Sequence, residues 1–584
     1  MKIDKAKMVG WFSPLQLLRT GWEVAISTIF GKHADNRLLE AALNPNPKDL
    51  YYDLSNPENN SGDFWIDYVS DVGDGWNSTY TVAYYLSQPT LKLDAEETKR
   101  GNLLVFGGDE IYPTAKTESY KQKLVKPYQT AFPDKAVINS PIVFAIPGNH
   151  DWYDSLTSFK QIFCRKQPFA GWQTIQERSY FAVSLPHHWW LFGTDIQLSS
   201  LMDEPQLEYF KQVMKVVKKD PQARIILCNA EPYWIYSKVN ENDNGNTQKA
   251  MEIFQGRILE GRVALYLAGD LHHYRRHENS LKKKHKIISG GGGAFLHPTH
   301  RQNVEKIGKN SIYDLKESFP DEVVSRQLCW QNLWFCWKNP WFGLVTGFLY
   351  LFNAIAYGLP SGDGFWTDLK ITLVHTFTRD FALIWVLINL IGLFYFTDKN
   401  TKFYQRILTT IVHALFHFAS LFTISWLFLK IFNGSSGGDS VNNYLLFKLM
   451  VLIFMGGYLV GSTLLGIYLL VTLNLFGWNQ NEAFASLSIE DYKNFLRLKI
   501  TEDELTIYPV GISKVSRNWK PGENGKSKLE PDDKKASLPQ LIEEPIRIKR
   551  DEVLSEDPNK FSASEKKEEE RIQALKKHEK KIEF

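Results

Sequence analysis

The sequence predicts an α/β domain followed, in the same chain, by an all-α transmembrane region of four helices. Residues 60–300 alternate apolar, strand-like runs with polar turns and helical stretches. After residue 340 the composition changes to long apolar spans without charged side chains. A helix of about 20 such residues crosses the hydrocarbon core of a bilayer. At 584 residues the chain is also too long for a single hydrophobic core.

Six segments follow from these patterns. They are an N-terminal helical segment at 1–59, the α/β domain at 60–305, a linker at 306–340, the transmembrane domain at 341–478, a small cytosolic segment at 479–512 and a charged, largely disordered tail at 513–584. Within the small segment, Ile489–Leu498 is helix-like and Leu505–Ile512 is strand-like. The tail is too charged and too poor in apolar residues to form a core, apart from a mixed-charge helix expected over 563–582.

The N-terminal residues 10–31 form an apolar and aromatic stretch in which Arg19 and Glu23 interrupt any signal-peptide core. They predict an amphipathic helix, which either packs on the domain or lies on the membrane. Packing on the domain is the favoured interpretation.

The apolar spans predict a multi-pass integral membrane protein. The spans are 341–359, 381–397, 407–429 and 449–478. The last is too long for one perpendicular crossing and short for two, so a tilted single helix fits it better. The loop at 398–406 carries Lys399, Lys402 and Arg406, whereas the centre of the following loop has no Lys or Arg. The positive-inside rule therefore places the α/β domain and the C-terminal tail in the cytoplasm.

The net charge and the cysteine spacing give no support for a nucleic-acid-binding surface or a cysteine metal site. The net charge of +3 gives no support for nucleic-acid binding by a basic surface. The four cysteines show no metal-ligand spacing, and we expect them to be reduced thiols.

Polar residues follow the predicted strands where each strand ends. The strands are 64–70, 102–106, 141–146, 180–185, 189–194, 224–228, 263–268 and 286–289. The strand ends carry Asp71 and Asp74, Gly108-Asp109, Gly148-Asn149-His150-Asp151, Glu231, and Gly269-Asp270-Leu271-His272. One Asp after a strand is most often a turn or a helix cap. Because several strand ends meet at one sheet edge, their joint occurrence predicts a single divalent-metal site.

These motifs, in this order, resemble those of the calcineurin-like metallophosphoesterase superfamily over residues 60–300. The resemblance implies a β-sandwich flanked by helices, with two divalent metals at the sheet edge. Asp109 would bridge both metals, Asp71 would bind the first, and Asn149 would bind the second. His150 would contact the phosphoryl oxygens or protonate the leaving group, with Asp151 orienting its ring. The metals would be Mn, Mg, Fe or Zn, with Mn favoured because the donors are hard.

The chain departs from that family's pattern at three imidazoles. Gly73, followed by Asp74, stands where the first motif has His; Ala230, beside Glu231, stands in the fourth; and Asp270 stands in the last. Either the site is rebuilt with oxygen ligands, or it has decayed. Random decay would not leave a carboxylate at or beside each lost imidazole, so a rebuilt site is favoured. The expected metal ligands are Asp71, Asp109, Asn149, Asp270 and His272, with Asp74 and Glu231 as further ligands.

The resemblance implies metal-dependent hydrolysis of a phosphate ester or anhydride at the cytosolic membrane face. The substrate would be a phosphorylated small molecule such as a nucleotide, or a lipid or lipid-linked phosphate. The alternative is a membrane protein that uses a degenerate phosphoesterase domain to bind a phosphorylated ligand or partner. Clustered carboxylates are expected to raise one another's pKa values when no metal is bound.

Overall fold

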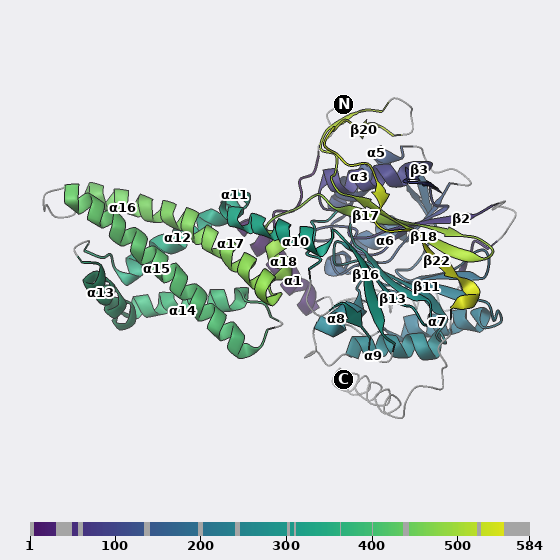
Figure 1. Cartoon of the computed structure of the whole chain (residues 1–584), viewed down its shortest axis with the longest axis horizontal. Helices are drawn as coiled ribbons and strands as arrows, with labels where there is room; N and C mark the ends of the chain where they lie inside the picture. Colours follow the sequence, from purple (N-terminus) through teal and green to yellow (C-terminus); the bar gives the residue numbers. More distant parts are fainter. Residues whose placement is uncertain are drawn as a thin grey trace.

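The structure is a computed structural model that describes residues 5–30, 50–55, 62–133, 140–196, 202–239, 246–300, 304–308, 311–361, 364–399, 401–435, 443–522 and 527–553. These residues form an α/β domain with an elongated helical bundle beside it (Figure 1). The predicted combination of a mixed α/β domain with helices of membrane length is confirmed.

All the strands predicted between residues 60 and 300 are present close to their expected bounds. They are β2 (Phe64–Val69), β5 (Leu103–Phe106), β6 (Ile142–Ala145), β9 (Phe181–Ser184), β10 (Trp189–Gly193), β11 (Arg224–Cys228), β12 (Val263–Ala268) and β14 (Lys284–Ser289). Each run is buried along its length and rich in β-branched and aromatic residues, which suits a strand that is covered on both faces.

In the part of the chain that is described, these strands belong to two nine-stranded sheets. The first has the order β1-β9-β10-β11-β12-β14-β13-β16-β15, and the second has the order β21-β18-β17-β2-β5-β6-β8-β7 with β22 paired to β18. The additional strands are β1 (Tyr52–Asp53), β7 (Pro168–Phe169), β8 (Trp172–Thr174), β13 (Tyr274–Asn279), β15 (Lys306–Ile307), β16 (Tyr313–Phe319), β17 (Lys493–Ile500), β18 (Glu504–Ile512), β21 (Gln540–Leu541) and β22 (Ile546–Lys549). One apolar cluster, which includes Phe64, Phe144, Phe181 and Leu265, takes residues from both sheets and forms the core between them.

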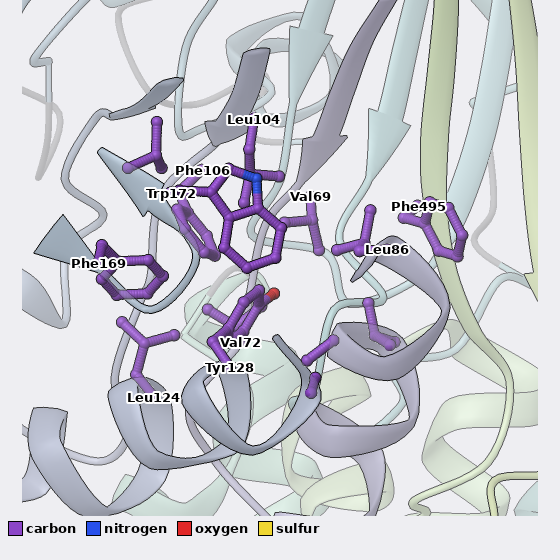
Figure 2. Close-up of a cluster of buried hydrophobic side chains, with 14 of the residues drawn as sticks. Val69, Val72, Leu86, Leu104, Phe106, Leu124, Tyr128, Phe169, Trp172 and Phe495 are labelled. Atoms are coloured by element: carbon purple, nitrogen blue, oxygen red, sulfur yellow. The ribbon is translucent and has the colours of Figure 1, made fainter. Parts of the chain in front are cut away.

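Helices cover the outer faces of both sheets. The second sheet is covered by α3 (Trp76–Ser87), α5 (Lys126–Ala131) and α6 (Thr157–Phe163), and the first by α7 (Glu204–Val217), α8 (Tyr233–Val239) and α9 (Asn246–Ile253). Figure 2 shows the core under α3 and α5, to which Phe495 of β17 contributes beside Leu86 of α3. A strand that follows the bundle in the sequence is therefore part of this core.

Two predictions for the C-terminal part are wrong. Ile489–Leu498 is not helical, because β17 pairs with β2 on one side and β18 on the other. The disordered tail does not begin at 513, because residues 513–522 and 527–553 are ordered and include β19 (Trp519–Pro521), β20 (Leu529–Pro531), β21 and β22. The α/β domain is therefore built from chain on both sides of the bundle, and 479–512 is not a separate segment. The helix predicted over 563–582 lies outside the described residues.

The bundle agrees with three of the four predicted spans, whereas the span predicted at 381–397 is found only as part of a bent helix pair. Within the described residues, three helices are long and apolar enough to cross a membrane, at Pro340–Tyr357 (α12), Phe403–Ile431 (within α15, Phe403–Ser435) and Tyr444–Phe476. The last runs from α16 (Asn443–Gly456) through α17 (Ser462–Val471) as one helix, as expected for 449–478. A bent pair, α13 (Phe365–Thr378) and α14 (Asp380–Phe396), meets at 88° and gives a fourth span if it is counted as one.

An apolar cluster at the junction joins the bundle to the domain. We call it the junction cluster; it contains Phe12, Phe295, Phe335, Leu469 and Phe484. The N-terminal helix α1 (Pro14–Phe30) begins two residues after Phe12 and lies between the domain and the bundle (Figure 1).

A buried ion pair fixes β17 to β2. Arg497 of β17 and Asp67 of β2 are both fully buried, and Arg497 Nε lies 3.1 Å from Asp67 Oδ1. The guanidinium also donates to the carbonyl oxygens of Tyr85, Leu86 and Gln88 at the C-terminal end of α3. Tyr85 O also accepts from Gln88 N at 3.3 Å, and the guanidinium supplies hydrogen bonds to all three carbonyls at this helix end. One side chain therefore links the end of α3, the buried carboxylate of β2 and the strand β17.

Replacing Arg497 with Met should lower the stability of the protein by about 3–5 kcal/mol, since it leaves the Asp67 carboxylate buried and unpaired. Lys499→Met is the matched control: it removes a cation from the same strand, where Lys499 pairs with Asp63 at 2.8 Å but is partly exposed. Thermal unfolding of the full chain in detergent should show a drop of several degrees for Arg497→Met and little change for the control. Equal shifts would contradict this role.

Candidate metal centre

Four strand ends meet at one edge shared by both sheets. β2, β5 and β6 are parallel neighbours in the second sheet, and β12 belongs to the first. The turns after β2 and β5 are hydrogen-bonded to each other, since Asp71 N donates to the Gly108 carbonyl at 2.9 Å. A Cβ on Gly148 would lie 1.9 Å from Asp109 Oδ1, so only glycine allows the turn after β6 to approach that carboxylate. The predicted assembly of these turns is present.

The hydroxyl of Tyr112 lies at the centre of this edge. It is 2.9 Å from Asp71 Oδ1, 3.0 Å from Asp109 Oδ2 and 2.9 Å from His272 Nε2. His272 Nε2 is 3.5 Å from the same Asp71 oxygen. All four side chains are buried. We call these residues the four-donor set.

The four-donor set has too few hydrogens for its acceptors. His272 Nδ1 lies 2.7 Å from the Phe295 carbonyl and must donate to it, which leaves Nε2 as an acceptor in the neutral ring. Burial lowers the pKa of His272 well below its usual value, which keeps the ring neutral. The single hydroxyl hydrogen of Tyr112 therefore faces two carboxylates and an imidazole lone pair. Asp71 and Asp109 also accept hydrogen bonds from the backbone N–H groups of Asp270 and His150, but the phenol hydrogen can satisfy only one of the three acceptors around it. An added proton or a cation would therefore stabilise the set.

A cation fits these distances. Two ligands at right angles, each about 2.1 Å from a metal ion, are about 3.0 Å apart. The phenol oxygen lies 2.9–3.0 Å from each of the other three donors. Within the described residues, His, Cys, Asp and Glu alone form no group of three arranged to hold a metal. The phenol is what completes this set, and the residues present fit one cation.

Two further predicted ligands lie beside the four-donor set. The end of the Asn149 side chain lies 3.1 and 3.2 Å from the two Asp109 oxygens. With its nitrogen toward Asp109 it donates two hydrogen bonds, and with its oxygen there a cation would be needed between the acceptors. Asp270 N donates to both Asp71 oxygens, at 3.1 and 2.9 Å, and its carboxylate accepts from the Tyr236 hydroxyl. Asp71, Asp109, Asn149, Asp270 and His272 are therefore brought together.

Asp74 and Glu231 have other surroundings. Asp74 Oδ1 accepts a hydrogen bond of 2.7 Å from Val9 N, so this carboxylate holds the N-terminal segment against the domain. Ala230 stands where the resembling family has an imidazole, and it packs against Gly108. A Cβ added to Gly108 would lie 2.5 Å from the Ala230 methyl. Glu231 follows Ala230 at the end of β11 and is half-buried. The geometry does not add either carboxylate to the four-donor set.

Asp151 does not orient the ring of His150, which was the role expected of it. His150 Nδ1 lies 2.6 Å from the Pro113 carbonyl, so Pro113 and not Asp151 orients the ring. Asp151 instead accepts from Gly148 N at 2.8 Å, from Glu110 N at 3.3 Å and from the Tyr120 hydroxyl. It holds the turns after β5 and β6 together and acts as a positioning residue.

The backbone of the site is strained at the donors themselves. Asp71, Asp109, Asp270 and His272 have φ of +57°, +54°, +68° and +48°. Residues other than glycine rarely adopt this left-handed region, which costs on the order of 1 kcal/mol or more for each. Strain repeated at the predicted ligands is typical of a site kept for function.

Burial and mutual repulsion raise the pKa values of the carboxyls at the site. Burial is the largest cause for Asp71 and Asp109, whose pKa values lie well above the usual range, followed by repulsion from Asp270 and Asp71 respectively. The predicted rise in the absence of metal is confirmed in direction. Burial also lowers the pKa of His150 to about 4, although the bond to Pro113 opposes this.

A loop of four glycines packs behind the metal centre. A Cβ on Gly290 would lie 2.7 Å from Asp71 Oδ2, and one on Gly292 would lie 2.4 Å from the Ser70 carbonyl. Lys493 Nζ donates to the Ala294 carbonyl at 2.5 Å, and Asn494 Oδ1 accepts from Gly291 N at 3.3 Å. The glycines are needed for close packing, and β17 holds them in place.

Sequence reasoning missed three contributors. Tyr112 has a local signal, since it stands three residues after Asp109 in the same turn. Lys493 has no local signal, because its strand β17 follows the bundle in the sequence, far from the other residues of the site. Trp11 has none either; its ring packs edge-on against His150 and Phe295, with centroid distances of 6.0 and 5.9 Å.

No protein-family model matches the chain, and no curated protein does. Among solved structures, GAP50, the anchor in the inner membrane complex of Plasmodium, is 13% identical, with a TM-score of 0.33 over 45% of this chain and 93% of that one. The purple acid phosphatase PPD1 of yellow lupin is 11% identical, with a TM-score of 0.30 over 44% of this chain and 48% of that one. PhoD is 10% identical, with a TM-score of 0.27 over 44% and 63%. At these TM-scores the likeness assigns neither a fold family nor an activity.

Without metal, the protein should become less stable as the pH rises. Carboxyls whose pKa is higher in the folded state stabilise it below their unfolded pKa of about 4, and this stabilisation is lost as the pH rises through the folded values. In chelator, the melting temperature should be lower at pH 8 than at pH 6, with a smaller decrease in Asp109→Asn. Added Mn²⁺ should remove the decrease in the wild type. An equal decrease with and without metal would contradict this.

Proposed function

We propose that this protein is a membrane-anchored, metal-dependent hydrolase of phosphate esters or anhydrides. The observation that carries the proposal is the four-donor set, in which one hydroxyl hydrogen faces two carboxylates and an imidazole lone pair. Such an arrangement is costly alone and is stabilised by a cation. The donors are mostly hard, so manganese, magnesium and iron suit them better than softer ions.

The residues have separate roles in this proposal. Asp71, Asp109, Tyr112 and His272 would hold one metal ion, and Asn149 and Asp270, with Asp109, would hold a second. Bound metals would polarise the phosphoryl oxygens and lower the pKa of a bound water. Asp151 holds the two turns in register, and Pro113 fixes the His150 ring through Nδ1. His150 Nε2 would then contact a phosphoryl oxygen or a leaving group.

The pairing of β2 with β17 supports an even number of membrane crossings. Both strands belong to one domain, so the chain before and after the bundle lies on one side of the membrane. Three long helices would give an odd number, and the bent pair would supply the fourth crossing. Asn479 N donates to Asp398 at 2.9 Å, which supports placing the nearby Lys399, Lys402 and Arg406 on the domain side. By the positive-inside rule that side is the cytoplasm.

The proposal is tested by metal content and by hydrolysis of bis(p-nitrophenyl) phosphate with Mn²⁺. Tyr112→Phe should weaken metal binding at least about tenfold, since loss of a ligand costs no less than loss of a residue that orients one. Asp109→Asn should lose metal and hydrolysis together. Tyr128→Phe is the matched control: Tyr128 is buried, and its hydroxyl has no partner among the described residues.

Each result decides between the two functions. Hydrolysis that is lost in Asp109→Asn and kept in Tyr128→Phe supports the hydrolase. Metal bound by the wild type without hydrolysis of any phosphate ester would favour the non-catalytic, ligand-binding alternative. If the wild type still bound no metal after loading with Mn²⁺ and then Fe²⁺, the metal centre itself would be wrong.

A further inference from the structure

The helix α1 exposes an apolar stripe beside the metal centre. Leu15, Leu18 and Trp22 are 80%, 73% and 69% exposed. Their spacing of three and four residues puts them on one face of the helix. A face of this kind is unfavourable in water, so it requires an apolar environment. This differs from the favoured expectation that the helix packs on the domain.

The position of α1 relative to the membrane is set by its contacts with the first membrane helix, α12. Phe12, two residues before α1, packs edge-on against Phe335 and Phe342, with ring centroids 5.1 and 5.5 Å apart. Phe342 is in the first turns of α12, and α1 itself lies against α12. The start of α1 is therefore fixed where α12 emerges on the domain side.

Exposed tryptophans indicate that the membrane interface lies at the start of α12. Trp330, Trp334, Trp337 and Trp341 are 60–65% exposed and surround the start of α12. Tryptophan side chains at the end of a membrane helix typically lie among the lipid headgroups. The stripe of α1 is linked to this belt by the buried contact of Phe12 with Phe335, which follows Trp334 in the chain. The apolar environment that the stripe requires is therefore the bilayer surface.

The rim of the proposed metal centre is partly exposed on the side that α1 borders. The four-donor set is buried, whereas Asn149, His150, Tyr153 and Asp270 are partly exposed. The short helix η4 (Asp151–Asp154) carries Tyr153, and α1 lies against η4. Trp11 packs against His150 from the same N-terminal segment. The rim of the metal centre and the interfacial helix are therefore neighbours.

We infer that α1 lies in the membrane surface and presents the metal centre to phosphate groups at the headgroup level, so that the substrate is a phosphorylated membrane lipid. This inference rests on the proposed hydrolase activity. A free phosphorylated metabolite has the same phosphate group but would gain nothing from the position of α1. A lipid is held at the rim by the bilayer itself, which raises its effective concentration there.

The position of α1 is tested without activity. A spin label at Leu18→Cys, in a Cys164→Ser background of the full chain in phosphatidylcholine vesicles, should be more accessible to oxygen than to a water-soluble nickel chelate. The other three cysteines are buried. Leu281→Cys is the matched control, because Leu281 is 88% exposed in the turn between β13 and β14. It should show the reverse order. A label at Leu18 with the accessibility of the control would overturn the inference.

The substrate class is tested by competition against hydrolysis of bis(p-nitrophenyl) phosphate. Phosphatidic acid in the vesicles should inhibit at concentrations about tenfold or more below those of glycerol 3-phosphate. The triple variant Leu15→Ser, Leu18→Ser, Trp22→Ser should remove most of that difference and leave inhibition by glycerol 3-phosphate unchanged. Leu281→Ser should change neither.

The outcomes separate the two proposals. If the wild type hydrolyses the soluble ester but phosphatidic acid inhibits no better than glycerol 3-phosphate, or the triple variant behaves as the wild type, the lipid inference is wrong and the hydrolase stands. If the wild type with metal present hydrolyses neither the soluble ester nor phosphatidic acid, the hydrolase fails and the lipid substrate fails with it.

Discussion

The pairing of β17 with β2, fixed by the buried Arg497–Asp67 ion pair, is the constraint on which the rest of the structure depends. The chain leaves the α/β domain, passes through the bundle and returns to complete the sheet that it left. A charge pair with no solvent must be formed fully or it destabilises the fold. Because the guanidinium also binds the end of α3, the core under that helix closes only when β17 has returned.

The same return completes the metal centre. Lys493 and Asn494, at the start of β17, bind the glycine loop that packs behind Asp71. The junction cluster links that loop, through Phe295, to Phe335 and Leu469 of the bundle, and the Phe295 carbonyl fixes the His272 ring. A displacement of the bundle relative to the domain would therefore act on a metal donor through two buried contacts. The bundle is part of the support of the site as well as its anchor.

The sequence predicts local features of this protein well and long-range ones poorly. The strand ends at Asp71, Asp109 and His272 were identified because a short apolar run followed by Gly and a polar residue is a local pattern. Tyr112 was missed because an aromatic residue in a turn has many structural roles. The sequence of β17 has a helix-like pattern, but it forms a strand because it pairs with β2, more than 400 residues earlier in the chain. Local periodicity contains no information about such a distant pairing.

The energetics of the metal centre indicate why its strain persists. Three features oppose folding of the metal-free chain. Several donors have left-handed backbone conformations, the buried carboxyls have raised pKa values, and the Tyr112 hydroxyl has one hydrogen for three neighbouring acceptors. The surrounding sheets offset these costs, since the turns are held by Asp151, by the glycine loop and by β17. In the proposed metal centre, a cation that bound the folded state and not the unfolded one would offset the remaining cost.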